Sequence, residues 1–296
     1  MRSLWTILCL SLLSAFLPAQ VPATTPQDTT PLAKALLWRI SGNGLTAPSY
    51  LFGTIHLIDR DKFRLDSLTR KSLHDARQVV FEFNLDKEMN PLALFGLVPK
   101  MMMKDKTLKD LLSDEDYELV RRRAKNAGLP FFLIKKLKPM FTGMMLEAPA
   151  GSTDTPDKVS YEMELLDMAK QAGKLIGGLE TMAYQMSVFD SIPLDVQAGI
   201  LVKELRDSTG AAGETDLEQI YISQDIEKMA RAANSIGNET VRRYLLVNRN
   251  HNWIPVIEEK MQQGTTFFAV GAGHLGGPDG IIRLLRRRGY RVEPVK

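Results

Sequence analysis

The chain has 296 residues, of which 44% are hydrophobic, and its formal net charge is +3. This is the length of one or two ordinary domains, and it supplies enough apolar material for a large core. So small a net charge excludes a strong electrostatic footprint for nucleic acid, and we expect no nucleic-acid partner.

The N-terminus has the pattern of an export signal. Arg2 precedes an apolar stretch over residues 4–17, which is too short to span a bilayer as a mature helix, and small residues follow it. We therefore expect a signal peptide over residues 1–23, a flexible leader over 24–35, and a periplasmic or secreted mature protein without a transmembrane segment. The only cysteine, Cys9, lies in the signal, which excludes disulfides, a cysteine nucleophile and thiolate ligands from the mature chain.

The first zone of the mature chain, residues 36–91, is rich in strand signals. Apolar runs at 37–40 and 49–53 flank the turn sequence Ser-Gly-Asn-Gly over 41–44, which predicts a hairpin. A helix expected over 65–76 leads to the apolar run Gln-Val-Val-Phe-Glu-Phe, which predicts a buried strand.

The second zone, residues 92–240, is predicted to be helical. It is rich in Met, Leu, Lys and Glu, and its apolar residues recur at spacings of three and four. One short strand, over 175–181, is expected to interrupt the helices.

The third zone, residues 241–296, repeats the order of the first. A helix over 241–262 precedes a strand over 265–270, and a helix over 280–288 precedes a strand over 290–294.

A Gly-x-x-His sequence follows a strand in both outer zones. It reads Gly53-Thr-Ile-His56 in the first zone and Gly271-Ala-Gly-His274 in the third. The repeated order predicts an α/β (α+β) fold, in which duplicated strand–GxxH–helix–strand units form one central sheet. We expect a single domain over 36–296, with sheet halves at 36–91 and 241–296 and the helical insertion at 92–240 between them.

Three residues are candidate metal ligands. His56 and His274 follow strands, and ligands bind at the carboxyl ends of strands in open α/β sheets. Imidazole is a common metal ligand, although a single histidine in such a turn can also serve only by bonding a loop carbonyl. Glu82 lies in an apolar strand, where an unpaired carboxylate is costly, so it needs a metal, a cationic partner or an exposed strand end. We expect a metal held by these three residues.

Four residues are candidate catalytic groups. Glu82 and Glu180 are carboxylates suited to proton transfer. Arg249 is suited to stabilising an oxyanion or holding a substrate carboxylate, and a buried Arg–Glu pair with either glutamate is the alternative. Asn250, next to it, is expected to orient the substrate.

On five motifs the chain resembles the TraB/GumN family, which includes the Tiki proteases. The motifs are Phe52-Gly-Thr-Ile-His-Leu57, Val80-Phe-Glu82, Gly178-Leu-Glu-Thr181 with Gln185, Val247-Asn-Arg-Asn-His-Asn-Trp253, and Val270-Gly-Ala-Gly-His-Leu-Gly-Gly-Pro-Asp-Gly280. The resemblance implies a bacterial GumN-type member that shares its fold with erythromycin-esterase-like and ChaN-like proteins, some of which bind haem. It also implies a divalent-metal-dependent protease centred on the paired GxxH histidines and a glutamate, with manganese or cobalt favoured over zinc or iron.

We therefore expect an exported metal-dependent hydrolase that acts on a peptide or small-molecule substrate. The alternative is a non-catalytic binding module for a peptide, haem or another small ligand, with the histidines as contacts.

Overall fold

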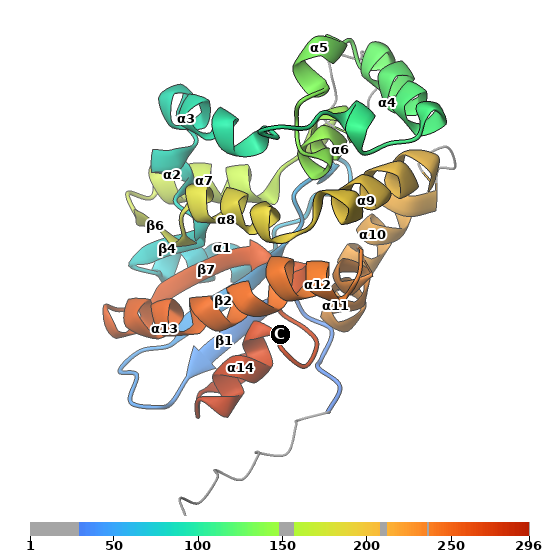
Figure 1. The fold of residues 1–296 in the computed structure, drawn as a ribbon. Helices are drawn as coiled ribbons and strands as arrows, with labels where there is room; N and C mark the ends of the chain where they lie inside the picture. Colours follow the sequence, from blue (N-terminus) through green and yellow to red (C-terminus); the bar gives the residue numbers. More distant parts are fainter. Residues whose placement is uncertain (1–29, 148–156, 208–211, 236, 296) are drawn as a thin grey trace, which may run out of the picture.

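A computed structural model describes residues 30–147, 157–207, 212–235 and 237–295 (Figure 1). The predicted signal peptide and residues 24–29 of the predicted leader lie outside these ranges. The described chain contains one six-stranded sheet, with helices around it, and this confirms the predicted mixed α/β architecture. Its strands are β1 Leu37–Ser41, β2 Ser49–Thr54, β4 Gln78–Phe83, β6 Leu175–Glu180, β7 Thr266–Gly271 and β8 Arg291–Pro294. A second sheet pairs β3 Ile58–Asp59 with β5 Lys158–Val159.

The strand order is β6-β4-β7-β2-β1-β8. The predicted hairpin is present as the antiparallel pair β1 and β2. Four strands, β6, β4, β7 and β2, run parallel to one another. In the central pair, Tyr50 of β2 lies opposite Phe267 of β7. The two GxxH segments, from opposite ends of the chain, therefore leave adjacent strands at the same edge of the sheet.

Alternating side chains divide the core between the two faces of the sheet. Phe268 and Val270 belong to one buried cluster, whereas Phe267 and Ala269 belong to the other. This is the period of two expected for strands covered on both sides. The first face is covered by α13 Asn248–Gln262 and α14 Ile281–Arg287, and the second by α1 Ser67–Asp75 and α7 Tyr161–Gln171.

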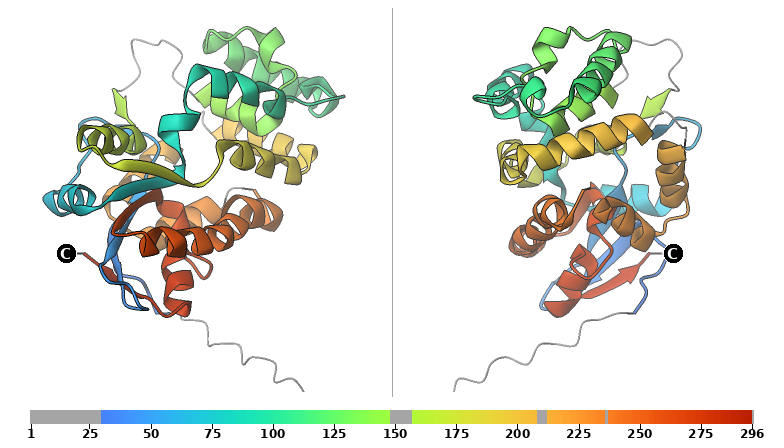
Figure 2. Two further views of the ribbon diagram at one scale, coloured as in Figure 1. Left: turned by 90° about the vertical axis from the view of Figure 1, so that its left-hand side faces the viewer. Right: turned by 45° about the vertical axis from the view of Figure 1, so that its right-hand side comes forward.

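The predicted insertion forms a helical layer with its own core, above the sheet in Figures 1 and 2. Its centre includes Val120, Ile134 and Leu201, all fully buried. Besides α7, the helices between β4 and α13 are α2 Leu85–Glu88, α3 Pro91–Met101, α4 Asp114–Asn126, α5 Phe131–Ile134, α6 Pro139–Glu147, α8 Met182–Val188, α9 Leu194–Asp207, α10 Ala212–Ile222, α11 Ile226–Asn234 and α12 Glu239–Arg242. Short helical turns add η1 Leu108–Asp110, η2 Phe189–Ser191, η3 Arg243–Val247, a π-helix, and η4 Ala272–His274.

The insertion also contributes an edge strand to the central sheet. The short strand predicted over 175–181 is present as β6, and it pairs in parallel with β4. This close pairing depends on Gly178, because a Cβ atom there would lie 2.5 Å from the backbone nitrogen of Asn84. The sheet is therefore built from three segments of the chain, not from two halves alone.

Packing against the sheet begins ahead of residue 36. Leu32 and Ala35 are buried in the first core cluster, and the Trp38 indole donates to the Ala35 carbonyl at 2.9 Å. Within the described ranges, the helices are too short or too polar to cross a membrane.

Candidate active site

Each of the four parallel strands delivers a predicted site residue to the carboxyl edge of the sheet. Glu82 and Glu180 lie within the last two residues of β4 and β6, and His56 and His274 follow β2 and β7. Parallel strands bring their carboxyl ends to one edge, which is the usual ligand edge of an open α/β sheet. The fold thus brings together residues that are more than 200 positions apart in the chain.

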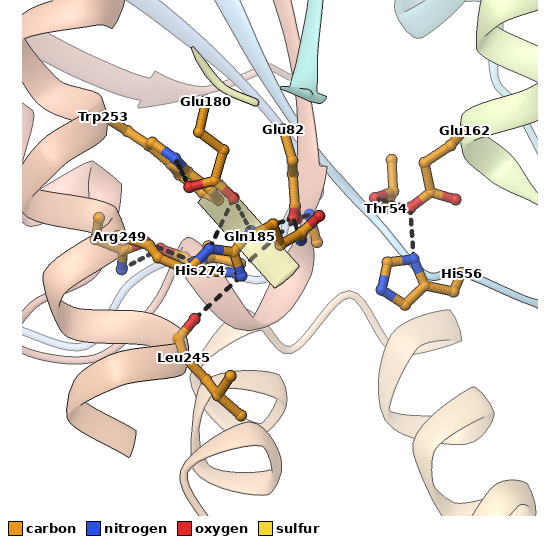
Figure 3. A network of polar contacts seen from close by, with 12 residues as sticks. Thr54, His56, Glu82, Glu162, Glu180, Gln185, Leu245, Arg249, Trp253 and His274 are labelled. Atoms are coloured by element: carbon orange, nitrogen blue, oxygen red, sulfur yellow. Dashed lines mark hydrogen bonds and ion pairs between the residues drawn. The ribbon is translucent and has the colours of Figure 1, made fainter. Parts of the chain in front are cut away.

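Arg249 is the hub of a buried polar network at this edge (Figure 3). Its guanidinium donates to Glu180 Oε1 from Nε at 3.0 Å and from Nη2 at 2.7 Å, and Nη2 also lies 2.6 Å from Glu82 Oε2. The Trp253 ring lies beneath the guanidinium, with its centroid 4.7 Å from Cζ. Arg249 therefore joins two strands to helix α13 through charge-assisted bonds.

The π-helical turn η3 supplies one more partner for this arginine. Nη1 of Arg249 donates to the Leu245 carbonyl at 3.1 Å, inside the turn that precedes α13. A π-helix shifts the hydrogen-bonding pattern of the backbone, and such turns are frequent at functional sites.

Glu82 is held as a carboxylate by this environment. Burial acts to raise its pKa, but the charges of Arg249 and His56 and the backbone hydrogen bond from Gly271 outweigh burial and hold the pKa of Glu82 below its ordinary value. Oε1 accepts from the Gly271 backbone at 2.9 Å, and Oε2 accepts from Gln185 at 3.1 Å. Glu82 is therefore ionised and fixed in direction.

Glu180 has the opposite shift. Burial raises the pKa of Glu180, although Arg249 and Trp253 act against it. Its second oxygen, Oε2, accepts from the Trp253 indole at 2.9 Å, so both oxygens are engaged. In this arrangement Glu180 orients Arg249. This is the buried Arg–Glu pair that the sequence indicated as the alternative role of Arg249.

His274 is buried and neutral. Its Nδ1 donates to Asn250 Oδ1 at 2.6 Å, while the amide nitrogen of Asn250 donates to the Asp279 carbonyl at 2.8 Å and to the His274 carbonyl at 3.3 Å. Burial, helped by the charge of Arg249 and opposed by that of Glu82, lowers the pKa of His274 to about 3. Because Nδ1 carries the proton, Nε2 keeps a lone pair, which accepts from Arg249 Nη1 at 3.4 Å. Oε1 of Glu82 lies 3.9 Å from the same nitrogen.

His56 differs from His274 in exposure and in partner. Its side chain is 83% exposed, and Nδ1 bonds Glu162 Oε1 at 3.1 Å. Thr54 and Ser160 donate to the two oxygens of the same carboxylate, at 2.8 and 3.0 Å. The hydrogen bond and charge of Glu162 raise the pKa of His56 to about 9.

Two of the three predicted metal donors fit a cation. A neutral imidazole nitrogen and an ionised carboxylate oxygen 3.9 Å apart are within the span of one ion that lies ~2.1 Å from each. Within the described part of the chain, no group of three or more His, Cys, Asp or Glu side chains gathers as a metal site. The three-ligand set of His56, His274 and Glu82 stays a prediction.

The sequence did not identify Glu162, which lies in the first turn of α7. An acidic residue after a Ser N-cap is typical of any helix start, so its link to His56, 106 residues away, had no local signal. Asn250 was predicted to orient the substrate, whereas in the structure it fixes the ring of His274.

Comparisons with known proteins identify the family of the chain. The chain matches the TraB/PrgY/gumN family over residues 36–294. It is similar to the protein named metalloprotease TIKI2 of Danio rerio, at 22% identity over 319 residues, covering 88% of this chain and 60% of the relative. It is also similar to the metalloprotease TIKI2 of Xenopus tropicalis, at 23% identity over 338 residues, covering 94% and 64%. The chain thus spans about three-fifths of the length of these curated relatives. No solved structure matches it significantly.

Proposed function

This chain belongs to the TraB/PrgY/gumN family, and on that premise we propose that it is an exported, metal-dependent hydrolase that cleaves peptides. One observation carries the proposal: the unprotonated Nε2 of His274 lies 3.9 Å from the ionised Oε1 of Glu82. Asn250 fixes the tautomer that leaves this nitrogen unprotonated, as the outer partners of metal-binding histidines do, and a bound cation would replace the bond from Arg249 Nη1.

In the proposed site, His274 and Glu82 hold the cation and His56 is the third donor. We assign His56 because it follows the neighbouring parallel strand at the same edge. Because Glu162 raises the pKa of His56 to about 9, a cation bound there would displace the proton from Nε2 of this imidazole. A divalent cation bound there would polarise a carbonyl group and lower the pKa of a water molecule.

The remaining residues position these groups. Glu162 fixes the imidazole of His56 through Nδ1, so that Nε2 is left for the site. Glu180 and Trp253 hold Arg249 beside the donors, where its guanidinium can stabilise negative charge that develops on a substrate oxygen.

The peptide substrate and the export of the chain have separate support. Both curated relatives are named metalloproteases, which favours a peptide bond as the target. The apolar stretch at residues 4–17 after Arg2 favours a signal peptide. We propose manganese or cobalt as the metal from the family resemblance.

The test is digestion of an unbiased peptide library by the mature chain, with manganese and with a chelator. We expect cleavage only with metal, and its loss in His274→Ala and His56→Ala. His251→Ala is the matched control, because His251 is half exposed and is not part of the network around Arg249. Metal content is measured in parallel by elemental analysis.

Cleavage that persists in chelator would contradict the proposal. Stoichiometric metal without cleavage of any peptide would instead favour the binding module.

A further inference from the structure

Helix α3 presents an apolar face to solvent. Its 11 residues include none that is buried, and Leu92, Phe95 and Val98 are 82%, 76% and 44% exposed. These three residues recur every third position, so they share one face of the helix. A Cβ atom added at Gly96 would meet nothing within 4 Å, which shows that the middle of the helix is also open.

A second apolar projection lies at the same end of the molecule. In the short helix α5, Phe132 and Leu133 are 67% and 53% exposed. The three views of Figures 1 and 2 place α3 and α5 in the helical layer farthest from the sheet. Scattered apolar residues on a surface are ordinary, but two clusters on one end of a protein mark an interaction surface.

Each apolar cluster adjoins a basic hollow. Beside α5, a hollow of about 630 Å³ is lined by Arg121, Arg122 and Lys125, with Glu118 as its acidic member. At the end of α3, a hollow of about 620 Å³ is lined by Lys100, Lys104 and Lys106, together with Asp105, Asp190 and Lys138. Apolar and basic groups therefore occur together twice on this end.

The positive charge of the chain is concentrated in this region. Residues 91–138 contain 11 lysines and arginines and six aspartates and glutamates, a net charge of +5, whereas the whole chain carries +3. The rest of the chain is therefore slightly acidic.

We propose that α3, α5 and the two basic hollows form a docking surface for an anionic lipid membrane. Exposed leucine and phenylalanine side chains enter the boundary between headgroups and acyl chains, while lysine and arginine side chains bind the phosphates. Self-association through this end is disfavoured, because it would bring two regions of net charge +5 together. The inference does not depend on the proposed hydrolase activity.

The docking surface is connected to the candidate active site through two packed helices. Helix α3 packs against α8, and Gln185 of α8 donates to Glu82 at 3.1 Å.

The test is co-sedimentation of the mature chain with vesicles of phosphatidylcholine alone and of phosphatidylcholine with phosphatidylglycerol. We expect binding to the anionic vesicles only. The double variants Leu92→Ser with Phe95→Ser, and Lys104→Glu with Lys106→Glu, should each weaken this binding by about tenfold or more. Circular dichroism confirms that each variant is folded.

Leu175→Ser and Lys228→Glu are the matched controls, because they change an exposed leucine and an exposed lysine outside the helical layer. They should bind like the wild type. Failure of the wild type to bind anionic vesicles would overturn the proposal, and so would equal binding by the double variants. A dimer in solution that is lost in the Leu92/Phe95 variant would show that the surface joins two copies of the chain instead.

Discussion

The guanidinium of Arg249 lies 2.6 Å from the carboxylate of Glu82, and it compensates the charge of that buried group without any metal. The other oxygen of Glu82 is left to face His274. One carboxylate is thus both half of a buried ion pair and a candidate ligand, and the two roles are separable by experiment.

Glu82→Gln should destabilise the fold, with or without metal. The change leaves a buried guanidinium with less compensating charge, which typically costs about 3–5 kcal/mol of unfolding free energy. We expect about 3 kcal/mol, the low end, because Glu180 still pairs with Arg249. Thermal and denaturant melts in chelator measure this loss. Glu293→Gln is the matched control, because Glu293 is half exposed and its pair with Arg39 is long, at 3.6 Å.

The same variant tests the ligand role of Glu82. If Glu82 holds the metal, the stabilisation that manganese gives the wild type should disappear in Glu82→Gln. Stabilisation by manganese that survives intact in the variant would withdraw Glu82 from the ligand set.

Asn250→Ala should release the ring of His274. The loss of a buried hydrogen-bond partner is expected to cost about 1–3 kcal/mol and to weaken metal binding by about tenfold or more. Nitrogen NMR of the imidazole should show a mixture of tautomers in place of the Nδ1-protonated form. Asn252→Ala, which removes an exposed bond to the Tyr184 hydroxyl, should leave both properties unchanged. A single unchanged tautomer in Asn250→Ala would refute this assignment.

His56 and His274 should titrate very differently in chelator. His56 should titrate near pH 9 and His274 near pH 3, because Glu162 raises the first pKa and burial lowers the second. The His56–Glu162 pair therefore stabilises the fold fully below pH 6.5, the ordinary pKa, and this contribution is lost as the pH rises through about 9. NMR titration of the imidazole signals measures both values.

Glu162→Gln provides the control for that titration. Removing the charge should return the pKa of His56 toward 6.5 and leave the signal of His274 in place. A pKa of His56 near 6.5 in the wild type would contradict the pairing seen in the structure.

Gly178→Ala should disrupt the pairing of β6 with β4. The added Cβ would lie 2.5 Å from the Asn84 nitrogen, and overpacking of this kind typically costs about 1–3 kcal/mol. Gly177→Ala is the matched control, because its nearest contact would be a side-chain carbon of Val80 at 3.4 Å. Equal unfolding free energies for the two variants, from denaturant melts, would show that the close approach at Gly178 is not required.

The sequence predicted the parts of the fold that depend on local signals. The hairpin of β1 and β2 has its turn glycines, and β4 and β7 are continuous apolar runs. The position of β6 was not predicted, because it depends on which strand edge remains free after β4 and β7 pair. A sequence pattern contains no information on that choice.

The candidate site residues were chosen from local signals, and their roles stay predictions. His56, His274 and Glu82 follow from strand ends and from the cost of a buried charge, and Arg249 from its fitness to pair with a glutamate. The difference in exposure between the two histidines follows instead from their surroundings: Trp253 packs 4.5 Å from the ring of His274, whereas His56 projects toward solvent beside Glu162. These are tertiary contacts, which periodicity does not predict.

The pairing of β2 with β7 has a consequence for how the protein comes into being. Tyr50 and Phe267 are opposite one another in the sheet but are separated by 217 positions in the chain. Closing so long a loop is slow, and the ribosome releases the N-terminal strand long before the C-terminal strand. The central pair of strands, and the two histidines after it, can come together only when synthesis of the chain is nearly complete. Until then one side of β2 is an unpaired strand edge, which is a template for pairing with other chains.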